Sequence, residues 1–108
     1  MGNFDYTQID DLIHSRIRTA IMAVLISVEE AEFTFLKEKV IATDGNLSVH
    51  LRKLEDAGYI TVKKNFIERK PVSRYKITSK GHKAFEAYIE KLEELLNNSK
   101  SQKNGKTD

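Results

Sequence analysis

The apolar residues in the first half of this chain recur at helical spacing. Between residues 7 and 28 they form two stripes separated by a break near Ser15, whose hydroxyl group suits the N-cap of the second part. That second part is apolar enough to be the central helix of a core. A very short strand is expected at Phe33, and residues 34–41 predict a short second helix.

A third helix is predicted at residues 46–57. One of its faces carries three leucines, Leu47, Leu51 and Leu54. The preceding residues 42–45 have the composition of a turn, and Asp44 or Asn46 is expected to cap the helix. Gly58 is expected to end it in the C′ position.

After the third helix the hydrophobic period changes from helical to alternating. Residues 59–63 and 72–78 have the composition and alternation of strands. Residues 68–71 lie between them and contain the only proline of the chain, so they are expected to form the turn. Two strands around a basic loop predict a β-hairpin.

The last predicted element is a long helix. Thr78 is expected to cap it, and its apolar face continues to about Leu96. The polar residues 98–108 are expected to be disordered. Residues 1–97 therefore predict one α+β domain, mostly helical, in the order helix, short helix, recognition helix, two-stranded hairpin (the wing) and long C-terminal helix, which is the layout of a winged helix-turn-helix.

The distribution of charge along the chain predicts what kind of ligand this fold binds. The chain carries a net charge of +2, but residues 60–83 hold eight basic residues and one acidic residue. That segment has a charge of +7, which leaves −5 for the rest of the chain. A basic segment that coincides with one hairpin and the helix start after it predicts a local binding surface for a polyanion.

Composition and motifs also exclude several classes. Without cysteine the chain has no disulfide, thiolate metal site or cysteine nucleophile. Neighbouring carboxylates such as 29–30 point in different directions along a helix, and there is no Gly-rich phosphate loop or nucleophile elbow. We therefore expect neither catalysis nor a cofactor. His14, His50 and His82 are too far apart in the sequence to predict a metal site, and His50, at the edge of the leucine face, is expected to be structural.

The predicted cellular location follows from two features. The longest apolar stretch, residues 20–26, is far too short to span a bilayer. The first eleven residues have neither the basic nor the apolar region of a targeting segment. We therefore expect a soluble, cytoplasmic protein.

The side of the third helix opposite the leucines is small near its start and cationic further along. Small residues let a helix enter the major groove of duplex DNA, where an arginine such as Arg52 can donate bidentately to guanine. The candidate contacts in this recognition helix are Asn46, Ser48, Val49, Arg52 and Lys53. The hairpin would lie along the adjacent groove or the backbone as a wing, with candidate contacts Lys63, Lys64, Arg69, Lys70 and Arg74.

Three segments resemble motifs of MarR/ArsR-type transcription regulators. Residues 46–60 (NLSVHLRKLEDAGYI) resemble the S-x-H-L-x-x-L-x-x-x-G-h-h signature of the recognition helix, where h is hydrophobic. Residues 75–81 (YKITSKG) are similar to the Y-x-L-T-x-x-G junction between strand and helix, and residues 16–21 (RIRTAI) to the R-h-x-I-L opening of the first core helix. The motifs span roughly residues 15–88 in the right order.

The resemblance implies a homodimer that regulates genes, most often as a repressor, with recognition helices in successive major grooves. It also implies a small-molecule effector, which the sequence does not identify. The chain differs from the family pattern in two ways. It is shorter than typical MarR proteins, and it lacks the cysteine metal box of many ArsR proteins.

The final helix is longer than a winged-helix body needs, and its apolar residues are spaced by four, three and four, which suits a helix–helix seam. We expect the termini to pack across a two-fold axis through Ile9, Leu12, Phe85, Ile89, Leu92 and Leu96. The alternative is that the final helix folds back over its own core. A dimer would hold two recognition helices about 34–36 Å apart and favour a near-palindromic site.

Two other functions remain open at this stage. Winged helices also serve as protein-interaction adaptors, in which case the basic wing would bind an acidic partner. An RNA-binding module could use the same hairpin, but Phe66 is the only aromatic candidate near it for stacking on unpaired bases.

Overall fold

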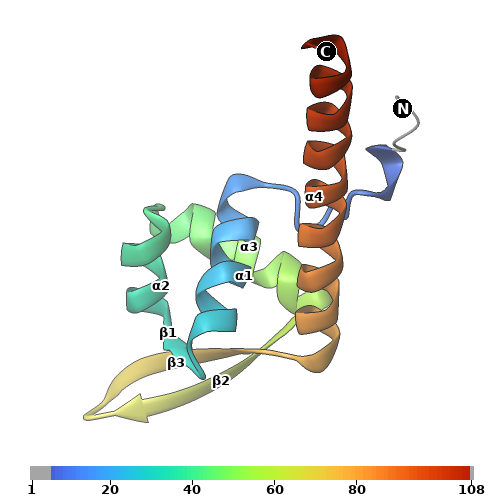
Figure 1. Cartoon of the computed structure of the whole chain (residues 1–108). Helices are drawn as coiled ribbons and strands as arrows, with labels where there is room; N and C mark the ends of the chain where they lie inside the picture. Colours follow the sequence, from blue (N-terminus) through green and yellow to red (C-terminus); the bar gives the residue numbers. More distant parts are fainter. Residues whose placement is uncertain (1–5, 108) are drawn as a thin grey trace.

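The computed structural model describes residues 6–107, and residues 1–5 and 108 lie outside the described part. The elements follow one another as η1 (a 3₁₀-helix, Tyr6–Gln8), α1 (Arg16–Ser27), β1 (Ala31–Glu32), α2 (Phe33–Val40), α3 (Asp44–Asp56), β2 (Ile60–Ile67), β3 (Lys70–Ile77) and α4 (Ser79–Thr107). Figure 1 shows α1, α2 and α3 grouped above the sheet, with the β2–β3 hairpin reaching away to one side and α4 standing on the other. This order confirms the predicted α+β winged helix-turn-helix.

The core lies between the three N-terminal helices, the sheet and the first half of α4. It is formed by fully or almost fully buried side chains from each of these elements, among them Ile21, Met22, Leu25, Leu36, Leu47, Leu54, Ile60, Tyr75, Phe85 and Tyr88. The leucine face predicted for α3 is therefore packed inward, and α1 is the central helix. Burial of this apolar surface is the main source of stability for the domain.

The first part of the predicted helix was wrong, because the stripe of Ile9, Leu12 and Ile13 lies in a non-helical segment between η1 and α1. Between η1 and α1 the chain turns on Asp10, whose Oδ1 accepts hydrogen bonds from the backbone nitrogens of Leu12 (2.9 Å) and Ile13 (3.2 Å). The predicted break at Ser15 is confirmed, because the Ser15 hydroxyl accepts from the Arg18 nitrogen and caps α1.

The sheet has three antiparallel strands in the order β1-β3-β2, so the predicted two-stranded hairpin gains a third strand. This strand, β1, pairs Ala31 with Tyr75 and Glu32 with Arg74. The expected strand position at Phe33 was wrong by one residue, since Phe33 is the first residue of α2. Ala31, the first residue of β1, is buried in the core.

The hairpin is longer and its turn tighter than the sequence predicted. Its strands pair from Ile60 with Ile77 out to Ile67 with Lys70. The turn consists of Glu68 and Arg69 alone, and both have positive φ, 52° and 69°. This geometry is that of a type I′ hairpin turn, which needs two left-handed residues and is normally signalled by Asn-Gly. Pro71 and Lys70, predicted in the turn, belong to β3.

Two predicted helix-end residues are confirmed, whereas several helix bounds differ from the prediction, including α2, predicted at 34–41 and found at 33–40. Gly58 has φ 80° after α3, and the Thr78 hydroxyl accepts from the Gly81 nitrogen at 2.9 Å, so both predicted roles are confirmed. The N-cap of α3 is Thr43, not Asp44 or Asn46, and α3 begins two residues earlier than predicted. The final helix continues to Thr107, beyond the predicted end near Leu96. The disorder of residues 98–108 stays a prediction.

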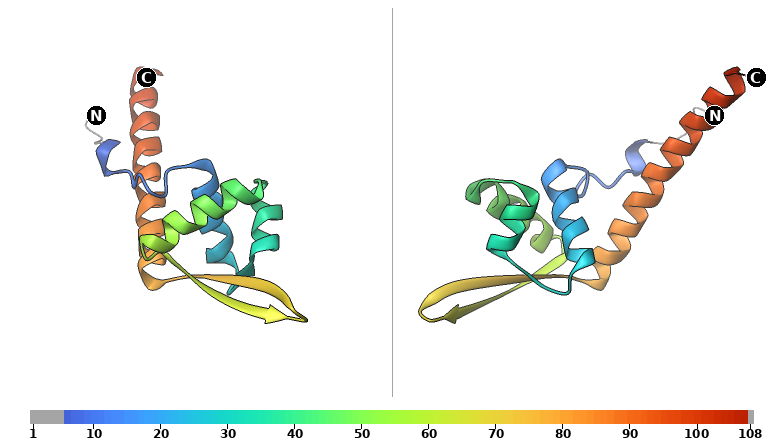
Figure 2. Two further views of the ribbon diagram at one scale, coloured as in Figure 1. Left: turned by 180° about the vertical axis from the view of Figure 1, so that it is seen from behind. Right: turned by 60° about the vertical axis from the view of Figure 1, so that its left-hand side comes forward.

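The root of the hairpin is held tightly against the start of α4. Thr78 donates its backbone nitrogen to the Tyr59 carbonyl (3.0 Å) and its hydroxyl to the Gly58 carbonyl (2.7 Å). A Cβ at Gly81 would lie 2.1 Å from the same Tyr59 oxygen, so only glycine permits this approach. The two views in Figure 2 show the consequence: the hairpin and α4 leave this junction in different directions.

Candidate nucleic-acid interface

The outer face of α3 is open to solvent along its whole length. Leu47, Leu51 and Leu54 are buried, whereas the five predicted contacts are all exposed: Asn46, Ser48, Val49, Arg52 and Lys53. Even the apolar side chain of Val49 is 54% exposed on this face. This arrangement leaves a small, partly cationic helix face free to meet a ligand.

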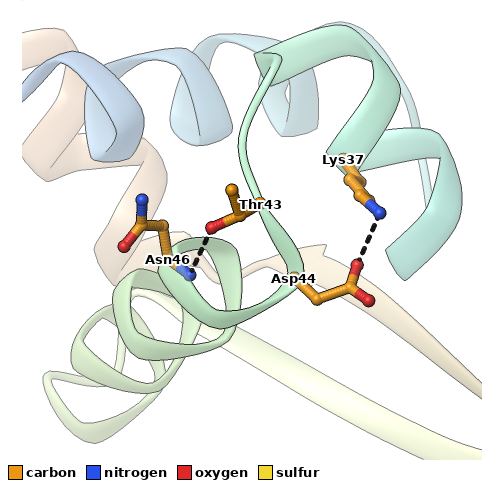
Figure 3. Close-up of polar contacts among 4 residues, drawn as sticks. All are labelled: Lys37, Thr43, Asp44 and Asn46. Atoms are coloured by element: carbon orange, nitrogen blue, oxygen red, sulfur yellow. Dashed lines mark hydrogen bonds and ion pairs between the residues drawn. The ribbon is translucent and has the colours of Figure 1, made fainter.

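The turn between α2 and α3 is fixed by two side-chain contacts (Figure 3). The Thr43 hydroxyl accepts from the Asn46 nitrogen at 3.2 Å. The ammonium of Lys37 lies 2.8 Å from Oδ1 of Asp44, which joins the end of α2 to the first turn of α3. A carboxylate at this position also interacts favourably with the helix dipole. Together these contacts link the end of α2, the turn and the first turn of α3.

Arg16, for which the sequence predicted no role, holds the end of α2. Its guanidinium donates to the Val40 carbonyl (3.0 Å) and to the Ile41 carbonyl (3.1 Å). Ile41 adopts φ 57° and is 78% exposed. Since these carbonyls have no partner within the helix, Arg16 acts as a C-cap supplied by α1. In the sequence, the only indication that Arg16 has a particular role is its place as the first residue of the motif at 16–21.

His50 is held by a second arginine of α1. The Arg18 guanidinium lies 2.7 Å from Nδ1 of His50, and its Nε donates to the Leu12 carbonyl. Because a guanidinium can only donate, Nδ1 is the acceptor and the imidazole is neutral. Burial, followed by the positive charges of Arg18 and Lys53, lowers the pKa of His50 below its usual 6.5. These contacts fit the structural role expected for this histidine.

The register of the hairpin divides the predicted wing cations between two faces. Side chains alternate along a strand, so the face that begins with the buried Ile60 continues through Val62 to Lys64 and Phe66. We call this the inner face of the wing. Lys63 and its partner Arg74 lie on the opposite, outer face.

Arg74 is engaged there by acidic residues of the β1 region. Its guanidinium lies 3.8 Å from the carboxylate of Glu30 and 3.7 Å from that of Glu32. Lys80, another cation of the basic segment, donates to the Ala57 carbonyl at 2.9 Å and so closes the end of α3. The cations at the hairpin tip, Arg69 and Lys70, are exposed.

A groove of about 250 Å³ joins the recognition helix to the inner face of the wing. Its lining contains Ser48 and Arg52 from α3 and Lys64 and Ser73 from the hairpin. Glu55 also lines it and partly offsets the positive charge. Of the five predicted wing residues, Lys64 is therefore the one that the structure brings beside the predicted contacts of α3.

The six residues predicted for a dimer interface are found in two kinds of environment. Phe85 is buried in the core of its own chain, and Ile9, Leu12 and Leu92 pack against that core. Ile89 and Leu96 are 38% and 53% exposed on α4. Next to this helix, a groove of about 560 Å³ is lined by side chains of α1, by His14 and Ser15 just before it, and by Tyr88.

The three histidines lie apart, each with its own neighbour. His14 Nδ1 is 2.9 Å from the Tyr88 hydroxyl, and His82 Nδ1 is 3.5 Å from the Glu86 carboxylate. Within residues 6–107 no group of three or more histidines and carboxylates is placed to hold a metal ion. In the same part of the chain, no helix has the length and apolar character needed to cross a membrane.

Comparison with known proteins places this architecture in a family. Residues 17–96 match the family model described as a winged helix DNA-binding domain. The chain belongs to that family. An uncharacterized protein of Methanocaldococcus jannaschii is 42% identical over 87 residues, which cover 81% of this chain and 95% of that protein.

Solved structures show the same fold at lower identity. A transcriptional regulator homologue from Pyrococcus horikoshii is similar with a TM-score of 0.80 and 23% identity, over 91% of this winged-helix chain and 97% of that one. A MarR family transcriptional regulator from Silicibacter pomeroyi has a TM-score of 0.64 and 15% identity, over 86% of this chain and 62% of that one. These structures confirm the winged-helix fold implied by the resemblance to MarR/ArsR-type regulators, and the family model confirms the DNA-binding family.

Proposed function

We propose that this winged-helix protein is a transcription regulator that binds duplex DNA in a sequence-dependent manner. The observation that carries the proposal is the exposed face of α3, which lies beside the inner face of the wing while its leucines are buried. In this arrangement α3 enters the major groove, and the wing lies on the adjacent groove or the backbone. Its membership of a DNA-binding family supports binding in preference to catalysis.

The proposed contacts divide by chemistry. Arg52 supplies base recognition through a bidentate hydrogen bond to guanine, with Asn46, Ser48 and Val49 close enough to refine it. Lys53, Lys63, Lys64, Arg69, Lys70 and Arg74 are the candidate partners of phosphates, which supply affinity that depends on salt. Arg74 must leave Glu30 and Glu32 to do so, and we expect it to contribute least.

We further propose that the protein acts as a cytoplasmic homodimer. The exposed Ile89 and Leu96 continue the apolar stripe of α4 beyond the part that covers its own core. A partner helix on this stripe would bury them and set two α3 helices about one duplex turn apart. The groove between α1 and α4 is the place where we expect an effector to bind, and repression is the regulatory outcome we expect from the family resemblance.

Selection from a random duplex pool, followed by quantitative binding, tests the proposal. We expect the selected sites to be near-palindromic, and Arg52→Ala to cost about 1–3 kcal/mol on them while random duplexes are affected much less. An Ile89→Glu/Leu96→Glu variant should sediment as a monomer and bind a single half-site. Equal losses on selected and random DNA would refute the role of Arg52, and a monomeric wild type at micromolar concentration would refute the dimer.

A further inference from the structure

The tip of the wing carries an apolar side chain, Phe66, that has no part in the proposed hydrogen bonds and ion pairs with DNA. Phe66 is 77% exposed and lies two residues before the two-residue turn. Exposure of a phenyl ring to water is unfavourable. At the end of a projecting element, an exposed phenyl ring therefore indicates a contact with a binding partner. The next residue, Ile67, is 45% exposed and points to the outer face.

Phe66 does not stand alone on the inner face. Its cross-strand partner is Pro71, and residues directly opposite each other in an antiparallel pair have side chains on the same side of the sheet. The pairing of eight residues along each strand, closed by a tight turn, holds both side chains in position. The result is a small apolar ridge of a phenyl ring and a pyrrolidine ring.

The surroundings of this ridge match the charge of duplex DNA. Lys64 lies two residues before Phe66 on the same face, about 7 Å back along the strand, and lines the groove that contains Arg52. Beyond it, Arg69 in the turn and Lys70, which shares the outer face with Ile67, are exposed, and Glu68 is the single acidic residue at the tip. Cations thus lie on both sides of the apolar ridge.

This spacing points to a specific site on the duplex. If α3 occupied the major groove, Lys64 would lie near the phosphate backbone between the two grooves, and the ridge farther along the wing would be placed toward the minor groove. Apolar side chains, phenylalanine and proline among them, act as wedges in the minor groove, where they separate stacked base pairs and kink the duplex. We propose that Phe66, backed by Pro71, is such a wedge and partly unstacks one base step next to the site read by α3.

The inference rests on the proposed DNA binding and adds deformation of the DNA to it. Sites that contain a flexible pyrimidine–purine step at the position of Phe66 would then bind best, although the wing makes no hydrogen bond to those bases. Sequence preference would arise at two places, from hydrogen bonds at α3 and from deformability at the wing tip.

The test uses the full chain and two matched variants of exposed apolar residues. Phe66→Ala removes the wedge, and Ile67→Ala removes a side chain of the same hairpin on the outer face. Unwinding is measured by incubating relaxed closed-circular plasmid with protein and topoisomerase, at protein concentrations that give equal occupancy of the DNA. Affinity for a short duplex is measured in parallel over a range of salt concentrations.

We expect wild type and Ile67→Ala to unwind the plasmid and Phe66→Ala to lose this effect at equal occupancy. Phe66→Ala should bind the duplex about ten-fold more weakly, as expected for a phenyl ring that is no longer buried. Its salt dependence should equal that of the wild type, because no charge is removed. Phe66→Leu, which keeps an apolar wedge, should restore most of the unwinding.

Four results would overturn the proposal. Unwinding by Phe66→Ala equal to that of the wild type refutes the wedge while leaving DNA binding intact. An equal loss in Ile67→Ala shows a general effect of the hairpin tip. A Phe66→Ala variant that unwinds DNA normally but no longer dimerises assigns the ridge to a protein contact. Failure of the wild type itself to bind duplex DNA refutes the proposed function, and the wedge with it.

Discussion

Replacement of Gly81 by alanine is expected to destabilise the protein, although alanine is the better helix former. Gly81 lies in the first turn of α4, where alanine would ordinarily stabilise a helix by up to about 1 kcal/mol. Here the added Cβ would lie 2.1 Å from the Tyr59 carbonyl oxygen and 2.9 Å from its carbon. Ordinary contact begins near 3.4 Å, so α4 and the root of the wing must separate by roughly 1 Å.

Such a separation would strain the backbone hydrogen bonds that join the root of the wing to the residue before α4. The Tyr59 carbonyl accepts from the Thr78 nitrogen at 3.0 Å, and Thr78 also bonds Gly58. Overpacking of a well-packed site typically costs about 1–3 kcal/mol, and the weakened bonds add to this cost. We therefore expect Gly81→Ala to lower the free energy of unfolding by about 2 kcal/mol after the gain in helix propensity.

Gly45 provides the control for this prediction. It also lies in the first turn of a helix, but a Cβ there would have no atom within 4 Å. Gly45→Ala should therefore raise the free energy of unfolding by about 0.5–1 kcal/mol. Both variants are measured by urea denaturation followed by circular dichroism. A Gly81→Ala protein as stable as the wild type, or more so, would refute the idea that α4 is locked against the wing.

Three further predictions concern single side chains. Thr43→Ala should cost about 0.5–2 kcal/mol of stability because the Asn46 nitrogen loses its acceptor, and an unchanged urea midpoint would exclude the cap. Glu68→Asn should raise thermal stability by up to about 1 kcal/mol, since Asn tolerates positive φ better than Glu, and a loss of stability would contradict the type I′ turn. Because the folded-state pKa of His50 is lowered, its contribution to stability is present above pH 6.5 and is lost as the pH falls through 6.5 toward the folded value. His50→Gln should flatten this part of the stability–pH curve, and a curve of unchanged shape would show that His50 is not the group responsible.

The helices could be predicted from the sequence because their signals are local and periodic. The spacing of Leu47, Leu51 and Leu54 fixes which side of α3 is buried, and hence which residues are exposed. A hydroxyl group suits the start of a helix, as at Ser15 and Thr78. Glycine suits the end of a helix, as at Gly58, because it adopts positive φ easily. At the start of α3, by contrast, Thr43, Asp44 and Asn46 are all suitable caps, and only the geometry of the turn selects Thr43.

The hairpin was harder to predict because it extends beyond the core. Alternation of apolar and polar residues ends at Val62, since no part of the core covers the residues beyond it. Glu68 and Arg69 carry no sequence signal for positive φ. The division of Lys63, Lys64 and Arg74 between two faces depends on the register of the strands, which a one-residue shift would invert.

The partners of Arg74 and Arg16 could not be predicted from local patterns either. Glu30 and Glu32 meet Arg74 only because the short β1 pairs with β3, far along the chain. Arg16 reaches the end of α2 across the packing of two helices. Such contacts follow from tertiary arrangement, and charge in the sequence alone does not distinguish an arginine that binds DNA from one that caps a helix.

The central claim is that the exposed face of α3 and the wing tip form one surface for duplex DNA. The most direct test is a titration of labelled duplex with wild type, an Arg52→Ala/Arg69→Ala/Lys70→Ala variant and a Lys91→Ala control on α4, outside the basic segment, at several salt concentrations. An excess of single-stranded RNA serves as competitor.

We predict tight binding by the wild type and the control, with affinity that falls steeply as salt rises and that RNA does not abolish. The triple variant should bind more weakly, and the slope of its salt dependence should be shallower by about one for each phosphate that it no longer neutralises. Absence of binding at low salt, or identical curves for the wild type and the triple variant, would contradict the account and favour a winged-helix adaptor that binds an acidic protein.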